Sequence, residues 1–434
     1  MNTELFIAKR ISFQGSQNFT KVIVGIAIVA IALCLSIMIV TTSVITGFKK
    51  DISEKIVSFW GDIHIHDTNL VNSAEKIPID NARFLMTEID SISYIQYEKA
   101  SSEDGYAFFS SEGEVSQTLG GVKSVQGTAE IPGLLRTATQ REGILLKGIG
   151  RDYDFSRLDK YIIEGSMLHL PDTAMSSDIL VSRSTARRLK LEVGQKVIMS
   201  FMKDQKHRKR SFVISGIYNT GLEEYDSKIA IVDIRKIQQL FGWSEDQVGV
   251  IEVLIDEKED LEVLSEYIYY DILPSNLYAE PITQKFPNIF QWLDLQDFNE
   301  RIVLWLMIIV GVINMITVLI ILILERTRMI GVLKALGMKS WSIRKIFIYN
   351  AGFIILMGLV VGNFLGIGIC LAQKYFGFIT LDEKSYYLSV APIEFNIPLL
   401  VIINISIIVI ILIVMIVPTL IIDRISPIKV LRFE

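Results

Sequence analysis

Long uncharged apolar stretches occur four times along the chain. They cover residues 22–48, 302–324, 346–373 and 395–422, and none of them contains Asp, Glu, Lys or Arg. About 20 apolar residues cross the hydrocarbon core of a bilayer as a helix, which satisfies every backbone group within one segment. The pattern therefore predicts four membrane-spanning helices.

The region between the first two stretches has a different pattern. Residues 49–301 alternate short apolar runs, typical of strands, with short helical patterns and turn residues. We expect strands at residues 63–66, 143–149, 178–182, 196–201, 211–218 and 248–255, and helices at 184–189, 234–241 and 259–269, with Asp233 as the N-cap of the second helix. A polar helix is expected from about residue 290 into the second span. The predicted fold class is a membrane α-helical protein with a large mixed α/β domain.

Composition agrees with membrane insertion. Of the 434 residues, 50% are hydrophobic and 21% charged, and the mean hydropathy is +0.41. Cys34 and Cys370 both lie in predicted spans, so no disulfide is expected in the large domain. The net charge of −5 is small, and no basic, aromatic-interleaved surface indicates binding to nucleic acid.

Lysine and arginine in the short loops predict the orientation, because positive charge resists translocation. Residues 325–345 contain six basic residues and one acid, Glu325, and are therefore expected in the cytoplasm. Residues 374–394 carry more acids than bases and are expected outside. With four spans, the segments 1–21 and 423–434 are cytoplasmic and residues 49–301 lie outside.

No catalytic motif is found in these 434 residues. They contain no G-x-x-x-x-G-K-[ST] phosphate loop, no nucleophile elbow, no zincin helix and no CxxC pair. No catalytic residue and no cofactor bound by this chain are therefore predicted. His64 and His66 alternate along a predicted strand and share a face, as two metal ligands would. Without a third ligand, an ordinary strand face is the preferred interpretation.

Small and polar residues recur inside the spans. Gly358, Gly362 and Gly366 are spaced every four residues, which predicts a smooth face for close helix packing. One amide lies in each of the last three spans, at Asn314, Asn363 and Asn404. Packing between helices and a substrate path are the two interpretations of these amides.

The predicted cytoplasmic segment has the pattern of a short amphipathic helix. Ile330, Leu333 and Leu336 follow helical spacing, and Gly337 is the expected C-cap. Two interpretations remain, a basic anchor on anionic lipid and a docking helix for an ATPase. On the second interpretation the coupling residues are Arg328, Ile330, Leu333, Lys334, Leu336 and Gly337.

Several short motifs together resemble one family. They are I-A-K-R at 7–10, S-V-I-T-G-F at 43–48, G-D-I-H-I at 61–65, E-R-T-R-M-I-G-V-L-K-A-L-G at 325–337, and Pro418 with Arg424, Pro427 and Leu431. With four spans and one large outside domain, the chain resembles the LolC/LolE-type lipoprotein-releasing ABC transporter permeases of the MacB/FtsX-like superfamily. It departs from them at Met329, where members commonly have an acid.

This resemblance implies a type VII ABC permease architecture in the inner membrane of a Gram-negative bacterium. Two permeases would assemble with separate ATPase subunits that bind ATP and Mg. The second permease would be either another copy of this chain or a sister chain. Movement driven by ATP would reach the periplasmic domain, a process called mechanotransmission. Lipoproteins would enter between the first two spans and pass to a periplasmic carrier. The cargo-path residues would be Ile45, Phe48 and Asn314, and Lys206, His207 and Arg208 in the loop 202–209 would dock the carrier.

Two other functions remain as alternatives. A MacB-like efflux permease would use the same architecture for another cargo, but such chains usually begin with a fused ATPase. An FtsX-like regulator would activate cell-wall hydrolases, but its outside domain is usually much smaller than residues 49–301.

Overall fold

The computed structural model describes residues 18–68, 77–98, 115–137, 140–203 and 206–424. The chain forms two compact units. The helical unit contains Met1–Asp51, Gln291–Leu381 and Ser389–Glu434, and the α/β unit contains Ile52–Phe290 and Asp382–Leu388.

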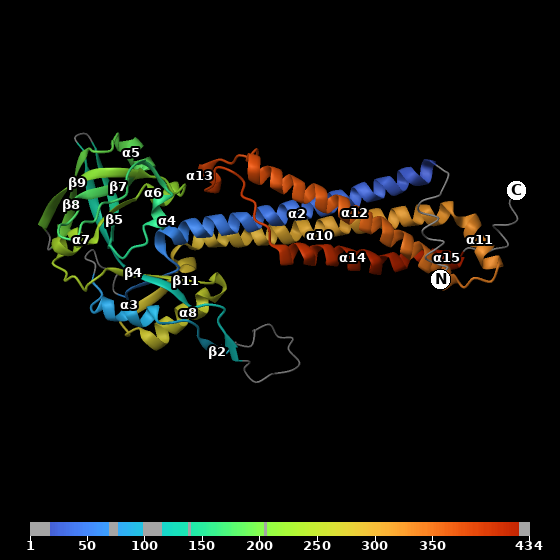
Figure 1. The fold of residues 1–434 in the computed structure, drawn as a ribbon, viewed down its shortest axis with the longest axis horizontal. Helices are drawn as coiled ribbons and strands as arrows, with labels where there is room; N and C mark the ends of the chain where they lie inside the picture. Colours follow the sequence, from blue (N-terminus) through green and yellow to red (C-terminus); the bar gives the residue numbers. More distant parts are fainter. Residues whose placement is uncertain (1–17, 69–76, 99–114, 138–139, 204–205, 425–434) are drawn as a thin grey trace. The chain divides into compact units, whose positions relative to one another are not determined.

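Four long helices run side by side in the helical unit (Figure 1). They are α2 (Asn18–Trp60), α10 (Pro287–Glu325), α12 (Ser340–Phe376) and α14 (Ile397–Thr419). Each is long and apolar enough to cross a membrane, which confirms the four predicted spans. The polar helix expected ahead of the second span is part of α10, and both α2 and α10 extend into the α/β unit.

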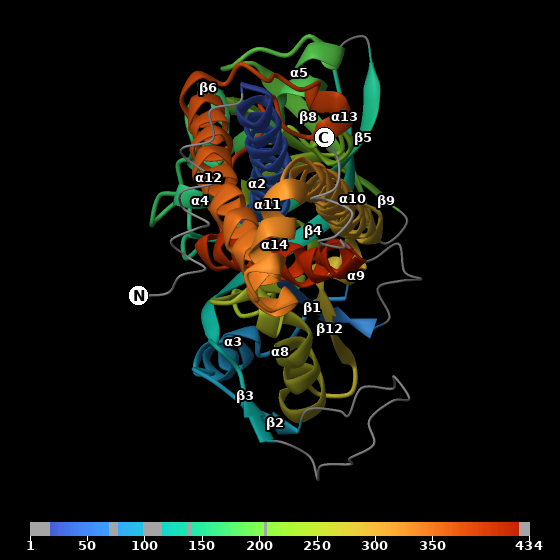
Figure 2. The same cartoon turned by 90° about the vertical axis from the view of Figure 1, so that its right-hand side faces the viewer.

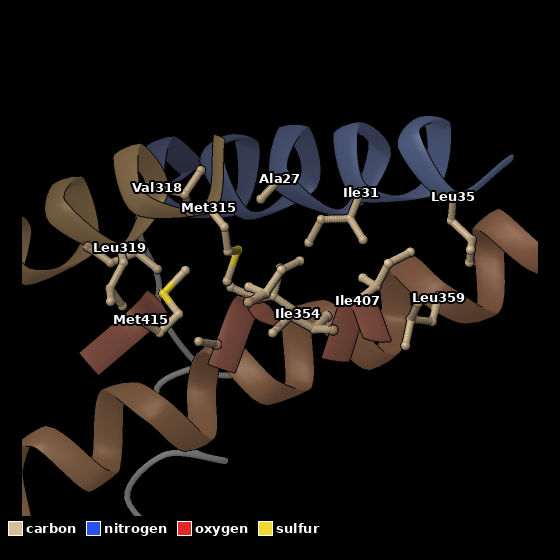
Figure 3. Close-up of a cluster of buried hydrophobic side chains, with 14 of the residues drawn as sticks. Ala27, Ile31, Leu35, Met315, Val318, Leu319, Ile354, Leu359, Ile407 and Met415 are labelled. Atoms are coloured by element: carbon tan, nitrogen blue, oxygen red, sulfur yellow. The ribbon is translucent and has the colours of Figure 1, made fainter. Parts of the chain in front are cut away.

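Apolar side chains from all four long helices form one buried cluster (Figure 3). The labelled members are Ala27, Ile31 and Leu35 of α2, Met315, Val318 and Leu319 of α10, Ile354 and Leu359 of α12, and Ile407 and Met415 of α14. Packing of this kind holds helices together in lipid, where burial from water contributes little between them.

Three glycines of α12 lie directly against α2. A Cβ atom added to Gly362 would lie 2.9 Å from the carbonyl oxygen of Ala32, and one added to Gly358 would lie 2.7 Å from Ile31 Cγ2. Gly366 has the same kind of neighbour, since its Cβ would lie 3.1 Å from Ser36 Cα. Only glycine permits this close approach of the two helices.

Two amides join α12 to α14. Asn363 Nδ2 donates to Asn404 Oδ1 at 2.7 Å, and Asn404 Nδ2 donates to Asn363 Oδ1 at 3.2 Å. Such reciprocal bonding satisfies both amides away from water. For these two residues the geometry favours the packing interpretation.

The α/β unit is built on a ten-stranded sheet. Its strands are β1 (Ile63–Asp67), β4 (Val122–Arg136), β5 (Arg141–Ile149), β6 (Ile162–Gly165), β7 (Asp178–Ser182), β8 (Lys196–Lys203), β9 (Lys206–Tyr218), β10 (Ile229–Asp233), β11 (Val250–Ile255) and β12 (Leu277–Pro281). The order is β12-β1-β11-β4-β5-β10-β7-β9-β6, and β8 pairs with both β4 and β9. A separate pair consists of β2 (Gln96–Glu98) and β3 (Val115–Gln117).

Strand β4 belongs to two parts of this sheet. Its first half pairs with β11, which continues to β1 and β12. Its second half pairs with β5 and β8, and the strands β4-β5-β10-β7-β9-β8 close into a ring. Helices α3 (Ala82–Asp90) and α8 (Leu261–Tyr267) lie with the first part (Figure 2).

The predicted helices of the large domain are present. Helices α5 (Arg183–Leu189) and α7 (Ile234–Phe241) occupy the expected segments. Asp233 caps α7 as predicted, because its carboxylate accepts the backbone N–H of Arg235 at 2.9 Å. The expected helix at 259–269 is divided into a 3-10 turn at Lys258–Asp260, then α8, then a π-helical turn at Ile268–Ile272.

The central strand β4 was missing from the sequence prediction. It contains Gly127, Pro132 and Gly133, residue types that strands normally avoid. Gly127 faces Val248, where an added Cβ would lie 2.8 Å from Val248 Cγ1, so glycine is required by packing.

The glycine contacts predict a difference between two conservative substitutions in α12. Gly362→Ala should lower the free energy of unfolding by about 1–3 kcal/mol, because the new methyl group meets the Ala32 carbonyl. Gly368→Ala is the matched control, since a Cβ there meets nothing within 4 Å and alanine favours the helix. Unfolding of both variants in the same mild detergent measures the difference, and equal stability would contradict the packing.

Candidate functional site

The amphipathic helix predicted between the second and third spans is α11 (Thr327–Ala335). It ends as expected at Gly337, where φ is +87°. The N–H of Gly337 donates to Lys334 O and that of Met338 donates to Leu333 O, both at 3.0 Å. This is a Schellman motif, which glycine favours at this position. Helix α12 then begins at Ser340, six residues earlier than the predicted third span.

One face of α11 is held by the helical unit. Ile330 is fully buried and Leu333 is half-buried against the apolar cluster. Lys334 Nζ donates to the carbonyl oxygen of Ile422 at 2.6 Å. Arg344 at the start of α12 pairs with Asp423. These contacts join α11 and the beginning of α12 to α15 (Ile421–Arg424).

The other face of α11 is open. Val332 on α11 and Leu336 at its C-cap are exposed, and Leu336 is 79% accessible. Trp341, in the first turn of α12, is also exposed. Arg328 is exposed on α11. An exposed apolar ridge with a basic flank is typical of a surface that a partner covers. The predicted coupling residues therefore divide into a buried supporting set and an exposed set.

The three predicted cargo-path residues do not form one site. Ile45 and Phe48 lie half-buried within one turn of each other on α2, and the Phe48 ring contacts the edge of Trp292 on α10 at 6.5 Å between centroids. Asn314 lies on α10 as well, half-buried. The 22 residues from Trp292 to Asn314 correspond to about 33 Å along a helix. The structure brings Ile45 and Phe48 together and leaves Asn314 distant.

The prediction of a loop at residues 202–209 is wrong. Strand β8 runs to Lys203 and β9 begins at Lys206, with Met202 paired to His207 and Phe201 to Arg208. The resemblance implied a loop here, but the pairing of β8 with β9 includes residues 202, 203 and 206–209, and the neighbouring Phe201 is buried. Lys206, His207 and Arg208 are exposed on β9, and lysine or arginine occupies four of the five positions from 206 to 210.

Lys147 and Glu252 form an ion pair inside the α/β unit. Lys147 lies on β5 and Glu252 on β11, and both side chains are 0% exposed with 2.6 Å between Nζ and Oε1. Glu252 Oε1 also accepts a hydrogen bond from Thr128 of β4 at 3.1 Å. Burial raises the pKa of Glu252, and the Lys147 ammonium opposes that rise. The pair therefore joins three neighbouring strands.

The same ammonium meets the C-terminal end of α2. Lys147 Nζ donates to the carbonyl oxygen of Phe59 and lies 4.9 Å from the ring centre of Trp60. Arg157 donates to the carbonyl oxygen of Val57. The last carbonyls of a helix lack intrahelical partners and carry partial negative charge, so cations stabilise this end.

Lys285 reaches this cluster from the other side. Its Nζ donates to His64 Nδ1 at 2.8 Å, lies 3.4 Å from Glu130 Oε1, and is 4.5 Å from the ring centre of Trp60. Burial first, and then Lys285 and Lys147, hold the pKa of His64 well below its usual value. His64 is therefore neutral at neutral pH, and its Nδ1 accepts a hydrogen bond from the Lys285 ammonium.

His64 gains two neighbours of ligand type in the structure. One ligand atom from each of His64, Glu130 and Glu252 lies within 4.8 Å of the others. The two ammonium groups of Lys147 and Lys285 already bond these same side chains. A divalent cation would face two positive charges, so this cluster does not fit a resident metal. His66 instead lies 3.5 Å from Glu280 on β12.

Asp226 is another buried carboxyl group of the α/β unit. Its oxygens accept the backbone N–H of Thr220 at 2.9 Å and the Thr220 hydroxyl at 2.7 Å, which closes the loop ahead of α6 (Glu223–Asp226). Burial raises the pKa of Asp226 to about 6, outweighing the hydrogen bonds from Thr220 that lower it.

Comparison with known proteins identifies the family. The sequence model described as MacB-like periplasmic core domain matches residues 24–268, which is more than half of the chain. The chain belongs to this MacB-like family. A second model, described as FtsX-like permease C-terminal, matches residues 301–427. Together the two matches cover all but residues 269–300 of the region from 24 to 427, and with the four long apolar helices they support the type VII ABC permease fold class.

Several relatives match over most of this MacB-like chain. The "Lipoprotein-releasing system transmembrane protein LolC" of Xylella fastidiosa (strain Temecula1) is 21% identical over 96% of this chain and 95% of the relative. LolC of Neisseria meningitidis serogroup B is 21% identical over 96% of both chains. LolE of Haemophilus influenzae is 21% identical over 86% of this chain and 83% of its own.

The raised pKa of Asp226 predicts that the free energy of unfolding depends on pH. Because the folded state holds the Asp226 proton more tightly than the unfolded chain, its contribution to stability is complete below pH 3.8 and is lost as pH rises through about 6. Relative to Asp226→Asn, the wild type should lose up to about 3 kcal/mol of unfolding free energy between pH 4 and 7. Unfolding of both proteins at both pH values measures this, and parallel pH profiles would contradict it.

Proposed function

We propose that this permease extracts lipoproteins from the inner membrane and passes them to a periplasmic carrier for sorting to the outer membrane. One observation supports this most strongly. Two relatives named as lipoprotein-releasing system transmembrane protein LolC match 96% of this chain and at least 95% of their own length. The similarity therefore extends over the helices and the α/β unit together.

The proposed orientation places both termini in the cytoplasm and the α/β unit in the periplasm. The support is the excess of basic residues around α11 and the acidic excess in residues 377–394. The chain would work with a second permease, either another copy or a sister chain.

ATP hydrolysis is proposed to take place on a separate ABC ATPase, which binds ATP and Mg and docks on α11. The open face with Val332, Leu336 and Trp341 is the surface it would cover. The carrier would dock on the exposed basic end of the β8–β9 hairpin, where Lys206, His207 and Arg208 suit a partner with an acidic face.

Purification from the native membrane in mild detergent tests the proposed function. We expect mass spectrometry to find a stoichiometric ABC ATPase together with triacylated lipoproteins, and depletion of the permease to leave outer-membrane lipoproteins in the inner membrane. Lipoproteins would be refuted as the cargo if an efflux adaptor or a cell-wall hydrolase copurified in their place and lipoprotein sorting stayed normal after depletion.

If the ATPase docks on α11, charged substitutions at the exposed Leu336 and at the half-buried Leu333 should have different effects. Leu336→Glu should abolish copurification of the ATPase and lower stimulated ATPase activity at least about tenfold, because a charge enters the covered face while the fold is untouched. Leu336→Met keeps the face apolar and should behave as wild type.

Leu333 behaves differently because it packs on the apolar cluster. Leu333→Glu should also lower the stability of the helical unit, which Leu336→Glu should not. If ATPase binding and activity survive Leu336→Glu, α11 is not the docking helix.

A further inference from the structure

The domain ends of α2 and α10 meet the same buried ionic cluster. Lys147 binds the Phe59 carbonyl in the last turn of α2. Lys285 lies two residues before α10 begins at Pro287. Trp60 contacts both ammonium groups, with ring-centre distances of 4.9 Å to Lys147 and 4.5 Å to Lys285. One cluster therefore contacts the ends of both helices that continue into the helical unit.

We propose that Lys147 is a positioning residue, which with Glu252 fixes the ends of α2 and α10 to the central sheet so that movement of either helix is passed to the α/β unit. This inference rests on the proposed function, because it assigns the residues through which ATP-driven movement would reach the outside domain. It adds a role for a buried pair that neither binds cargo nor contacts the ATPase surface on α11.

On the sheet, the ionic cluster connects neighbouring strands. Glu252 on β11 bonds Thr128 on β4, and Lys147 lies on β5, so three adjacent strands share the pair. Glu130 of β4 lies 3.4 Å from Lys285. A buried charge tolerates little displacement, because separation of the pair leaves an uncompensated ion in a nonpolar interior. The helix ends are thus fixed to the sheet at a defined distance.

Aromatic side chains also pack where the ends of α2 and α10 meet the sheet, and this region is called the joint below. The rings of Trp60 and Phe286 lie 5.5 Å apart, and Phe286 contacts Tyr225 of α6 edge-on at 4.8 Å. Phe59 packs on Tyr218 of β9 at 5.7 Å. A hinge at either helix end would have to break this packing together with the ion pair.

A contribution to stability is a weak explanation for the presence of a buried ion pair. Replacing a buried ion pair by neutral side chains of similar volume is often tolerated, whereas removing one partner is strongly destabilising. The double variant Lys147→Met/Glu252→Gln is therefore the informative one. It removes both charges and the bond to the Phe59 carbonyl while keeping side-chain volume.

Hydrogen exchange on the full-length protein tests the joint itself. In the double variant, backbone amides at residues 57–63 and 282–289 should exchange at least about tenfold faster than in wild type, while amides of β10 stay protected. In the complex with its ATPase, lipoprotein released per ATP hydrolysed should fall to about a tenth or less, with ATP hydrolysis retained.

The control is another ion pair of the same unit, in which the acid is buried and the base is partly exposed. Asp233 and Arg235 are paired at 2.7 Å, and the Asp233 side chain is 1% exposed. Asp233→Asn/Arg235→Met removes that charge pair but keeps the cap of α7, and it should change neither the exchange at the joint nor the release per ATP.

Two results would overturn the inference. A folded double variant with wild-type exchange at both helix ends would show that the pair does not fix them, and faster exchange with unchanged release per ATP would show that the joint does not transmit movement. If the double variant does not fold, Lys285→Gln replaces it, with faster exchange expected at 282–289 only. A wild-type complex that releases no lipoprotein would refute the proposed function instead, and exchange alone would then decide the joint.

Discussion

A lysine ammonium with no access to solvent constrains the whole α/β unit. Lys147 is compatible with burial only because Glu252, the Phe59 carbonyl and the surrounding aromatic rings together replace its water. Lys147 lies on β5, whereas these partners come from β11 and α2, which are far apart in sequence. The strands, the end of α2 and the approach to α10 therefore have to adopt one arrangement before the charge is satisfied.

The helical unit depends on a different kind of constraint. Lipid tails are as apolar as the side chains between helices, so close contact and hydrogen bonds decide which faces meet. Gly358, Gly362 and Gly366 allow α12 to touch the backbone of α2, and the Asn363–Asn404 pair fixes α12 to α14. One helix thus organises the unit through two separate faces.

The two surfaces assigned to partners differ in their chemistry. The face of α11 is apolar and small, with its opposite side anchored by Ile330 and by Lys334. The end of the β8–β9 hairpin is strongly basic and carries Lys206, His207 and Arg208. An apolar patch binds mainly by excluding water, whereas a charged hairpin steers a partner of opposite sign. The proposed ATPase and the proposed carrier would bind through these two different modes.

Several features that depend on neighbours along the chain could be predicted from local sequence patterns. Apolar length predicted the four spans, helical spacing and Gly337 predicted α11, and Asp233 predicted the start of α7, because each rests on local backbone chemistry. Strand β4 was missed because Gly127, Pro132 and Gly133 are residue types that strands normally avoid. The extension of the β8–β9 hairpin was missed because the sequence does not show which residues pair across strands. Only the tertiary structure brought Lys147, Glu252, Glu130 and Lys285 around His64. Those residues lie up to 221 positions apart, and no local pattern encodes which buried charges will neutralise one another.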